Sequence, residues 1–188
     1  MPQHHETSVN QQDLAQAIVR VSHLTAAFRL RSGEMSAHYF DKYQFETDPA
    51  LLCRVASALA PLVPTDTEIL AGLELGGIPL ATALALNVGL PVVFVRKEQK
   101  AYGTEKLAEG VPIAGKRLCV VEDVITTGGQ VVKSTEALRA RGAIVDWALC
   151  VIWRGRADGR LLDQAGIRTR CLFDIHDLAP WIDNLLQS

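Results

Sequence analysis

From Glu68 onward, short apolar runs alternate with segments of helical spacing, and this alternation limits the fold more than any other feature of the sequence. The runs VVFV (92–95) and LCVV (118–121) contain no polar residue, as in strands that are covered on both faces. Strand, turn and helix in repetition indicate βαβ units. The sequence therefore predicts an α/β fold with a central, mostly parallel sheet flanked by helices. The expected strands lie within 68–73, 91–95, 117–123, 143–153 and 171–173, and the expected helices between them lie within 79–87 and 130–142.

The two ends of the chain follow a different pattern and are expected to build a small cap on this core. Apolar residues recur at helical spacing over 13–29, which predicts an amphipathic helix. Asp48 followed by Pro49 is typical of a helix start, and this second helix is expected to run to Pro61. Further helices are expected over 158–164 and near the C-terminus from Leu178 to Leu186. We expect one domain, comprising a polar tail (1–12), N-terminal helices and a hood (13–66), a core (67–157) and C-terminal elements (158–188).

Charge and hydropathy exclude several classes of partner. Nineteen Lys and Arg against 21 Asp and Glu give a net charge of −2, so the total charge does not indicate binding to a polyanion such as nucleic acid. No stretch approaches the ~18 consecutive apolar residues of a membrane span, and the amino end lacks the apolar segment of a secretory signal. We therefore expect a cytoplasmic protein that binds neither nucleic acid nor membrane. Four cysteines without a metal-binding pattern are expected to be buried, reduced thiols: Cys53, Cys119, Cys150 and Cys171.

The segment LCVVEDVITTGGQ (118–130) carries the clearest chemical signal. A buried strand ends in two adjacent carboxylates, Glu122 and Asp123, and a turn of small residues then leads into a helix that begins near Gln130. Backbone N–H groups and threonine hydroxyls at a helix start suit a phosphate monoester. Carboxylates repel phosphate and instead suit a cis-diol or Mg²⁺, so the pair of sites fits a ribose 5-phosphate. Asp123 is expected to face this ligand without a buried partner in the protein, and the alternative is an ordinary polar loop. The residues expected to hold the phosphate are Thr126, Thr127, Gly128 and Gly129.

Two further loops follow predicted strands. The connection over 96–116 is longer than usual for a strand-to-helix or strand-to-strand loop, and it carries Arg96, Lys97, Lys100 and Lys106. A basic loop with glycines is suited to closing over pyrophosphate and excluding water, whereas the alternative is a solvated run of charges. The glycines of the 74–77 turn indicate backbone donors that face pyrophosphate oxygens, and the alternative there is a plain turn between strand and helix.

Four segments resemble, in the same order, those of orotate phosphoribosyltransferases, a family of the type I phosphoribosyltransferase superfamily. VVEDVITTGG (120–129) resembles the binding motif for 5-phosphoribosyl 1-pyrophosphate (PRPP). FRLRSGEMSAHYFD (28–41) resembles the orotate-binding stretch of that family, and GLELGGIPLA (72–81) resembles its pyrophosphate loop. FVRKEQKAYGT (94–104) resembles its mobile catalytic loop. Four ordered motifs over 28–130 are more specific than the PRPP motif alone.

The resemblance implies transfer of the 5-phosphoribosyl group from PRPP to orotate with Mg²⁺, giving orotidine 5′-monophosphate and pyrophosphate in pyrimidine nucleotide synthesis. It further implies a homodimer whose loop cations reach the partner's active site. Catalytic roles are implied for Arg96, Lys100, Tyr102 and Asp123, with any metal contact of Asp123 made through PRPP and water. PRPP binding is implied for Glu74, Leu75, Gly76, Gly77, Arg96, Lys97, Lys100, Glu122, Asp123, Thr126, Thr127, Gly128 and Gly129. Base binding is implied for Arg31, Tyr39, Phe40, Thr126 and Arg154.

The chain departs from the family pattern at four of these places. Arg31 and Gly76 stand where lysines are common, Tyr102 stands where the mobile loop commonly has His, and Trp153 stands where Asp commonly precedes Arg154. Because these positions belong to the base site and the loops, a phosphoribosyltransferase for another nucleobase is one alternative. A non-catalytic, PRPP-sensing regulator on the same fold is a second. A regulator that binds nucleic acid would carry a basic recognition patch, and the cap sequences contain none.

Overall fold

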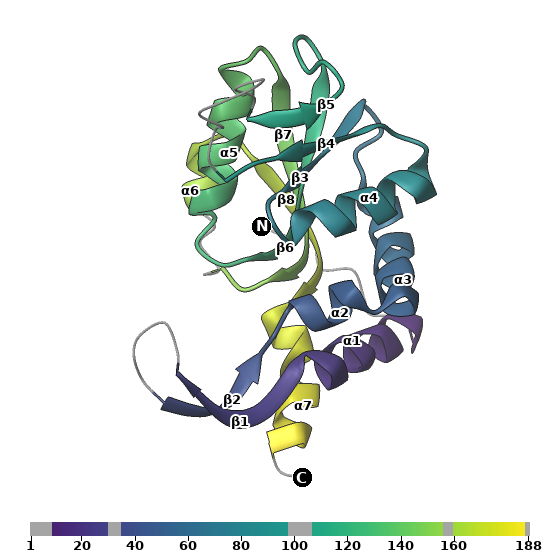
Figure 1. Ribbon diagram of the computed structural model, residues 1–188, viewed down its shortest axis with the longest axis vertical. Coiled ribbons are helices and arrows are strands. Elements are labelled where there is room, and N and C mark those ends of the chain that lie inside the picture. The colour runs from purple at the N-terminus through teal and green to yellow at the C-terminus, as the bar shows by residue number, and fades with distance from the viewer. Residues whose placement is uncertain (1–8, 30–34, 98–106, 156–159, 187–188) are drawn as a thin grey trace.

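The computed structural model describes residues 9–29, 35–97, 107–155 and 160–186, with a six-stranded sheet at its centre (Figure 1). The strand order is β5-β4-β3-β6-β7-β8, and all neighbours are parallel except β5, which pairs antiparallel with β4 at one edge. The predicted fold class is thereby confirmed. The strands are β3 (Ile69–Leu73), β4 (Val92–Val95), β5 (Ala108–Gly110), β6 (Arg117–Ile125), β7 (Ile144–Trp153) and β8 (Arg168–Asp174).

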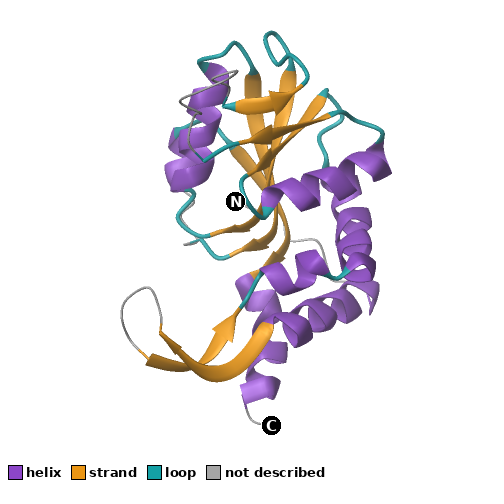
Figure 2. Ribbon diagram, in the orientation of Figure 1, coloured by secondary structure: helices purple, strands orange, loops and turns teal. Residues whose placement is uncertain are grey.

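Helices cover both faces of this sheet (Figure 2). α4 (Gly77–Val88) links β3 to β4 on one face, and α5 (Gly129–Arg139) links β6 to β7 on the other, where α6 (Arg160–Gln164) lies beside α5 (Figure 1). The parallel pairs β3–β4 and β6–β7 therefore each have a crossover helix packed on the sheet, which accounts for the apolar runs without alternation. No helix in the described part of the chain has the length and hydrophobicity needed to cross a bilayer.

The two ends of the chain pack together below the sheet in Figure 1. α1 (Val9–Ser22) lies against α7 (Ile175–Leu186), and α2 (Tyr43–Thr47) and α3 (Pro49–Leu59) follow the hairpin of β1 (His23–Arg29) and β2 (Met35–Phe40). A short 3-10 helix, η1 (Ala60–Leu62), ends this region. The predicted helix start at Asp48 is confirmed, since its carboxylate accepts the Leu51 N–H at 2.9 Å and Pro49 is the first helical residue.

The helix predicted over 13–29 is wrong in its second half. α1 ends at Ser22, and His23–Arg29 instead form β1, which pairs antiparallel with β2. The rings of Phe28 and Tyr39 pack across this hairpin with centroids 5.3 Å apart. Apolar residues spaced by three and four positions fit a helix locally, but the ladder of hydrogen bonds to a segment further along the chain decides for the strand.

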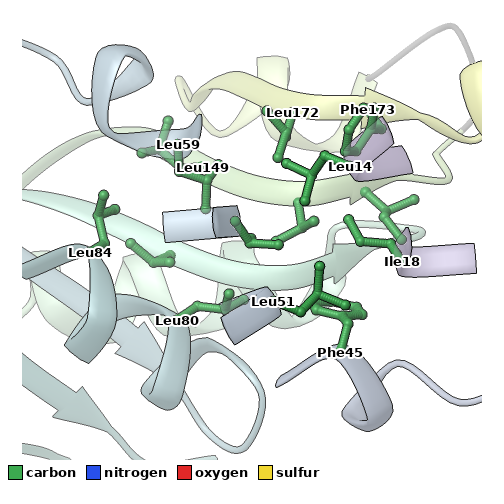
Figure 3. Close-up of a cluster of buried hydrophobic side chains, with 14 of the residues drawn as sticks. Leu14, Ile18, Phe45, Leu51, Leu59, Leu80, Leu84, Leu149, Leu172 and Phe173 are labelled. Atoms are coloured by element: carbon green, nitrogen blue, oxygen red, sulfur yellow. The ribbon is translucent and has the colours of Figure 1, made fainter. Parts of the chain in front are cut away.

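The core is divided between the two faces of the sheet. One hydrophobic cluster joins the inner faces of α1, α3, α4 and α7 to β6, β7 and β8, and Figure 3 shows Leu14, Phe45 and Phe173 among its side chains. A second cluster packs α5 and α6 against the opposite face. Phe45 is fully buried, so the five-residue helix α2 is held firmly in the first cluster.

Two expectations about loops and thiols are corrected by the structure. The long connection after β4 is not loop throughout, because Ala108–Gly110 form β5 on the sheet edge. Cys119 and Cys150 are buried as expected, and burial raises the pKa of the Cys119 thiol to about 12. Cys53, in contrast, is exposed on α3, because its helix presents this position to solvent.

Candidate functional site

The turn after β6 has the form expected of an anion site. Gly128 adopts φ +77°, in the left-handed region, and α5 begins at the next residue. The N-cap residue Gly128 has no side chain that could cap the helix, so the start of α5 presents backbone N–H groups and the positive end of the helix dipole at this turn. The Thr127 hydroxyl accepts the N–H of Gly129 at 3.5 Å. These features agree with the predicted phosphate seat over 126–129.

The end of β7 lies beside this turn. The backbone N–H of Arg154 donates to the Ile125 carbonyl at 2.8 Å, which places Arg154 next to Thr126 with its side chain exposed. Leu162 of α6 packs under Gly128, where an added Cβ would come within 2.9 Å of its Cγ. Two of the residues predicted for the base site, Thr126 and Arg154, therefore share one edge of the sheet.

Asp123 is buried, which differs from the expectation that it has no buried partner. Its carboxylate has no exposed surface, and Oδ2 lies 2.6 Å from Nζ of Lys42. The other oxygen, Oδ1, accepts the N–H of Val124 at 2.5 Å. The reason for the difference is tertiary, because α2 from the N-terminal region docks at the carboxyl end of β6 and brings Lys42 with it.

Three carboxyl groups meet at this point. Glu46 is a buried residue, and its Oε1 atom accepts no hydrogen bond. The Oε2 atom of Glu122 is also buried and accepts no hydrogen bond. Burial raises the pKa of Glu46 to about 9, and the neighbouring Asp123 adds to the rise. Burial likewise raises the pKa of Glu122 to about 9, with the charge of Asp123 as the second cause. At neutral pH, Glu46 and Glu122 therefore hold protons beside the ion pair of Asp123 and Lys42.

Burial and the neighbouring acids have opposite effects on the pKa of Lys42. Burial lowers the pKa of its ammonium group, but the hydrogen bond and charge of Asp123, together with the charge of Glu122, outweigh burial and raise the pKa above its ordinary value of 10.5. Lys42 therefore keeps its positive charge over the physiological range of pH.

The turn after β3 lies directly on this group of acids. A Cβ placed on Gly76 would be 1.9 Å from Oδ2 of Asp123 and 2.7 Å from Oε1 of Glu46, so both oxygens surround the same point. A Cβ on Gly77 would be 2.2 Å from the Val121 carbonyl oxygen, where α4 begins against β6. Only glycine fits at either position with this backbone. The two glycines therefore let the turn after β3 lie against the end of β6 that carries Glu122 and Asp123. The peptide bond between Glu74 and Leu75 is cis.

The turn over 74–77 is joined to the start of the connection that follows β4. Oε2 of Glu74 accepts the backbone N–H of Lys97 at 2.8 Å, and Leu75 beside it is exposed. Arg96 forms an ion pair with Glu109 of β5, with Nε and Oε1 3.4 Å apart. The structure thus brings the predicted residues 74–77, Arg96 and Lys97 to one edge of the sheet. Lys100 and Tyr102 lie outside the described residues.

Two of the residues predicted for the base site, Tyr39 and Phe40, lie at the end of β2 in the N-terminal hairpin. Tyr39 is 45% exposed at the end of β2 and Phe40 is half-buried, and both precede Lys42 by two or three positions. Arg31 lies outside the described residues.

Sequence reasoning missed Lys42 and Glu46 as members of this site. Lys42 is the N-cap residue of α2 and Glu46 lies within this short helix. No sequence motif connects either residue with the distant Glu122–Asp123 pair. A Glu among the inward-facing residues of a helix is the one available signal, because Glu46 follows the buried Phe45 in α2.

The carboxyl groups do not form a closed metal site. Among the described residues, no group of three or more His, Cys, Asp or Glu side chains is placed to hold a metal ion. Three carboxyl oxygens accept no hydrogen bond, one each on Glu46, Glu122 and Asp123, and the Asp123 oxygen is instead paired with Lys42. Once Glu46 and Glu122 release their protons, their oxygens fit a cation that brings most of its ligands with it as water and substrate oxygens. The donor set therefore fits Mg²⁺ that arrives together with a phosphorylated substrate.

Glu46→Gln is expected to raise the stability of the unliganded protein near pH 8 and to change it little near pH 4. With a pKa of about 9, folded Glu46 keeps a proton that the unfolded chain releases above its ordinary pKa of 4.5. The free energy of unfolding therefore falls as the pH rises from about 4.5 to about 9, and glutamine removes this contribution. Thermal melts across that range measure the effect, at about 2–4 °C in Tm for each kcal/mol.

Glu136→Gln is the matched control, since Glu136 is an exposed glutamate on α5. Its Tm profile should run parallel to that of the parent at every pH. A Glu46→Gln profile that also runs parallel to the parent would contradict a protonated Glu46 in the folded protein.

Comparison with known proteins agrees with this geometry. Residues 43–180 match the family model of the phosphoribosyl transferase domain. The orotate phosphoribosyltransferase of Nocardioides sp. is 51% identical over 157 residues, which cover 84% of this chain and 88% of that protein. The orotate phosphoribosyltransferase of Methanocella arvoryzae is 42% identical over 151 residues, covering 80% and 86% of the two chains.

Solved structures show the same fold. The orotate phosphoribosyltransferase of Mycobacterium tuberculosis H37Rv, crystallised in complex with PRPP, superposes with a TM-score of 0.74 at 27% identity. The match covers 90% of this chain and 99% of that one.

Proposed function

This chain belongs to the phosphoribosyl transferase domain family, and we propose that it transfers the 5-phosphoribosyl group of PRPP to orotate, giving orotidine 5′-monophosphate and pyrophosphate. The observation that carries the proposal is the end of β6, where an acidic pair is followed by the turn over 126–128 and the start of α5. The first feature suits the ribose hydroxyls and the second suits the 5-phosphate. Identity of 51% with an orotate phosphoribosyltransferase over most of both chains supports orotate as the base.

In this reaction, the bond from ribose C1 to the pyrophosphate oxygen breaks while a bond from C1 to a ring nitrogen of orotate forms. Pyrophosphate leaves with the electron pair of the broken bond, and the ring nitrogen releases its proton to solvent. Thr126–Gly129 hold the 5-phosphate, and Glu122 and Asp123 receive the ribose hydroxyls. The protein contributes orientation and electrostatic stabilisation of charge as it develops on the leaving group, with no covalent intermediate on a side chain.

The leaving pyrophosphate is assigned to the loops at the same edge. Backbone N–H groups of 75–77 donate to its oxygens, while Arg96, Lys97 and Lys100 supply positive charge. Mg²⁺ would be held by PRPP oxygens and water beside Asp123 and Glu122, and it supplies further neutralisation of the pyrophosphate charge when bound. Closure of the basic loop over the site would exclude water that would otherwise hydrolyse the ribosyl centre.

The base is assigned to the space between the hairpin and the end of β7. Arg31 and Arg154 would contact the carboxylate or carbonyl groups of orotate, and Tyr39 and Phe40 would pack on its ring. Thr126 lies between this group and the phosphate seat. Because both substrates are small charged metabolites that do not diffuse across membranes, the proposal includes a cytoplasmic location.

The proposal also includes a homodimer in which Lys100 of one subunit acts on PRPP held by the other. Lys100→Ala and Asp123→Asn proteins are each expected to be nearly inactive. Mixed under subunit exchange, they should regain about one quarter of the parent activity, since half of the dimers carry one intact site. Rates of pyrophosphate release before and after mixing measure this regain. Heterodimers that form without any regain would contradict the shared site and leave the transferase activity untouched.

The activity itself is tested with purified protein, PRPP, Mg²⁺ and a panel of nucleobases, by following pyrophosphate release. Release that depends on orotate is the expected result. Release with only another base would reassign the base specificity. PRPP binding without release for any base would favour a PRPP-sensing regulator.

A further inference from the structure

Lys42 comes from outside the PRPP motif and forms an ion pair with Asp123 near the end of β6. Its Nζ lies 2.6 Å from Oδ2 of Asp123, and its side chain is 33% exposed whereas that of Asp123 is 0% exposed. The lysine is therefore partly open to solvent, whereas the carboxylate that it contacts is not.

The position of Lys42 is fixed by the N-terminal region. The backbone N–H of the preceding Asp41 donates to the Ser22 carbonyl at 2.7 Å, which ties the end of the hairpin to the end of α1. The Asp41 carboxylate accepts the N–H of Tyr43 at 3.1 Å and the side-chain amide of Gln44 at 2.9 Å. Phe45 anchors the same helix in the core with no exposed surface. The backbone that carries Lys42 is therefore held at three points.

The group of acids needs a cation from outside the pyrophosphate loop. The absent Cβ of Gly76 would overlap Oδ2 of Asp123, so this part of the loop approaches the acids with backbone alone. Lys42 holds one Asp123 oxygen and the Val124 N–H holds the other, so the carboxylate has a fixed orientation before any substrate binds.

From this arrangement, and resting on the proposed function, we propose that Lys42 is a positioning residue of the PRPP site, which holds the Asp123 carboxylate in the orientation that receives the ribose of PRPP. A carboxylate that is already oriented loses no further freedom when the substrate binds. Since Tyr39 and Phe40 precede Lys42 in the same segment, the ion pair also ties the hairpin of the base site to the strand of the PRPP site.

Three variants test the proposal: Lys42→Ala removes the contact, Lys42→Met keeps most of the length without the charge, and Lys42→Arg keeps the charge. Lys116→Ala is the matched control, because Lys116 forms a similar ion pair with Glu68, 2.8 Å long, beside the opposite end of β6. Calorimetry of PRPP binding and steady-state rates with PRPP varied are measured for each protein, together with Tm.

Lys42→Ala and Lys42→Met are expected to lower kcat/KM for PRPP by about 10- to 100-fold and to weaken PRPP binding, as losses of supporting contacts typically do. Lys42→Arg should recover a substantial part of kcat/KM and of the PRPP affinity. Lys116→Ala should change neither quantity by more than about twofold. If Lys42→Ala does not fold, the proposal is tested by comparing the kcat/KM and PRPP affinity of Lys42→Met with those of Lys42→Arg.

Lys42→Met with the parent's PRPP affinity and rate, whatever its Tm, would overturn the positioning role and make the pair purely structural. A parent protein that binds PRPP without turnover would remove the proposed function, while PRPP affinities of the variants would still test Lys42. A parent that neither binds PRPP nor releases pyrophosphate would overturn both.

Discussion

Asp123→Asn is expected to lower kcat/KM for PRPP by about 100-fold or more, which corresponds to about 3 kcal/mol of transition-state stabilisation. Asparagine has nearly the same shape, but it loses the negative charge and half of the acceptor capacity that the proposed PRPP site offers to the ribose hydroxyls. Steady-state pyrophosphate release with PRPP varied measures the loss.

Folding should be affected far less than activity by this substitution. Lys42 retains acidic neighbours, because Glu46 and Glu122 lie in the same group and can ionise when Asp123 is neutral. The Tm is therefore expected to shift by only a few degrees, about 2–4 °C for each kcal/mol. Parent-like turnover of PRPP by Asp123→Asn would mean that the acidic group is structural and that the site lies elsewhere.

Gly77→Ala is expected to destabilise the protein by about 3 kcal/mol or more, which would lower Tm by about 6–12 °C. The new methyl group would come within 2.2 Å of the Val121 carbonyl oxygen, an atom of a buried central strand that has no room to withdraw. α4 would have to move away from β6, and the turn that precedes it would move away from Asp123. Thermal or denaturant unfolding measures the change.

Gly129→Ala provides the comparison for this prediction. Gly129 is also the first residue of a helix after a strand, but its added Cβ would meet only the Thr127 hydroxyl at 3.7 Å, an ordinary contact. Its stability should stay within about 0.5 kcal/mol of the parent. Equal stability of the two alanine variants would contradict the close packing of α4 on β6.

The sequence was sufficient for those parts of the fold that depend on short-range pattern. The strands over 92–95 and 118–121 are recognisable because burial on both faces requires an unbroken apolar run. Asp48 and Pro49 mark the start of α3 through contacts within four residues. The Thr126–Gly129 turn and the acids before it lie within one strand-turn-helix unit, so their spacing along the chain already places them together.

The sequence could not decide features that depend on partners elsewhere in the chain. The segment 23–29 has apolar spacing that fits a helix, and only its pairing with β2 makes it a strand. β5 is a strand because β4 offers it an open edge. Cys53 is exposed and Cys119 is buried, although both stand among apolar residues.

The candidate site also combines features that the sequence determines with features that only tertiary contacts determine. The sequence by itself determined which residues can bind a ribose phosphate, because Glu122, Asp123 and the turn after them are neighbours in the chain. Only the tertiary structure decided that Asp123 is buried against Lys42, that Glu46 joins the acids, and that Gly76 closes over them. The physical reason is that charge and burial act through space: the pKa of Glu46 and the orientation of Asp123 depend on groups that folding brings within a few ångströms.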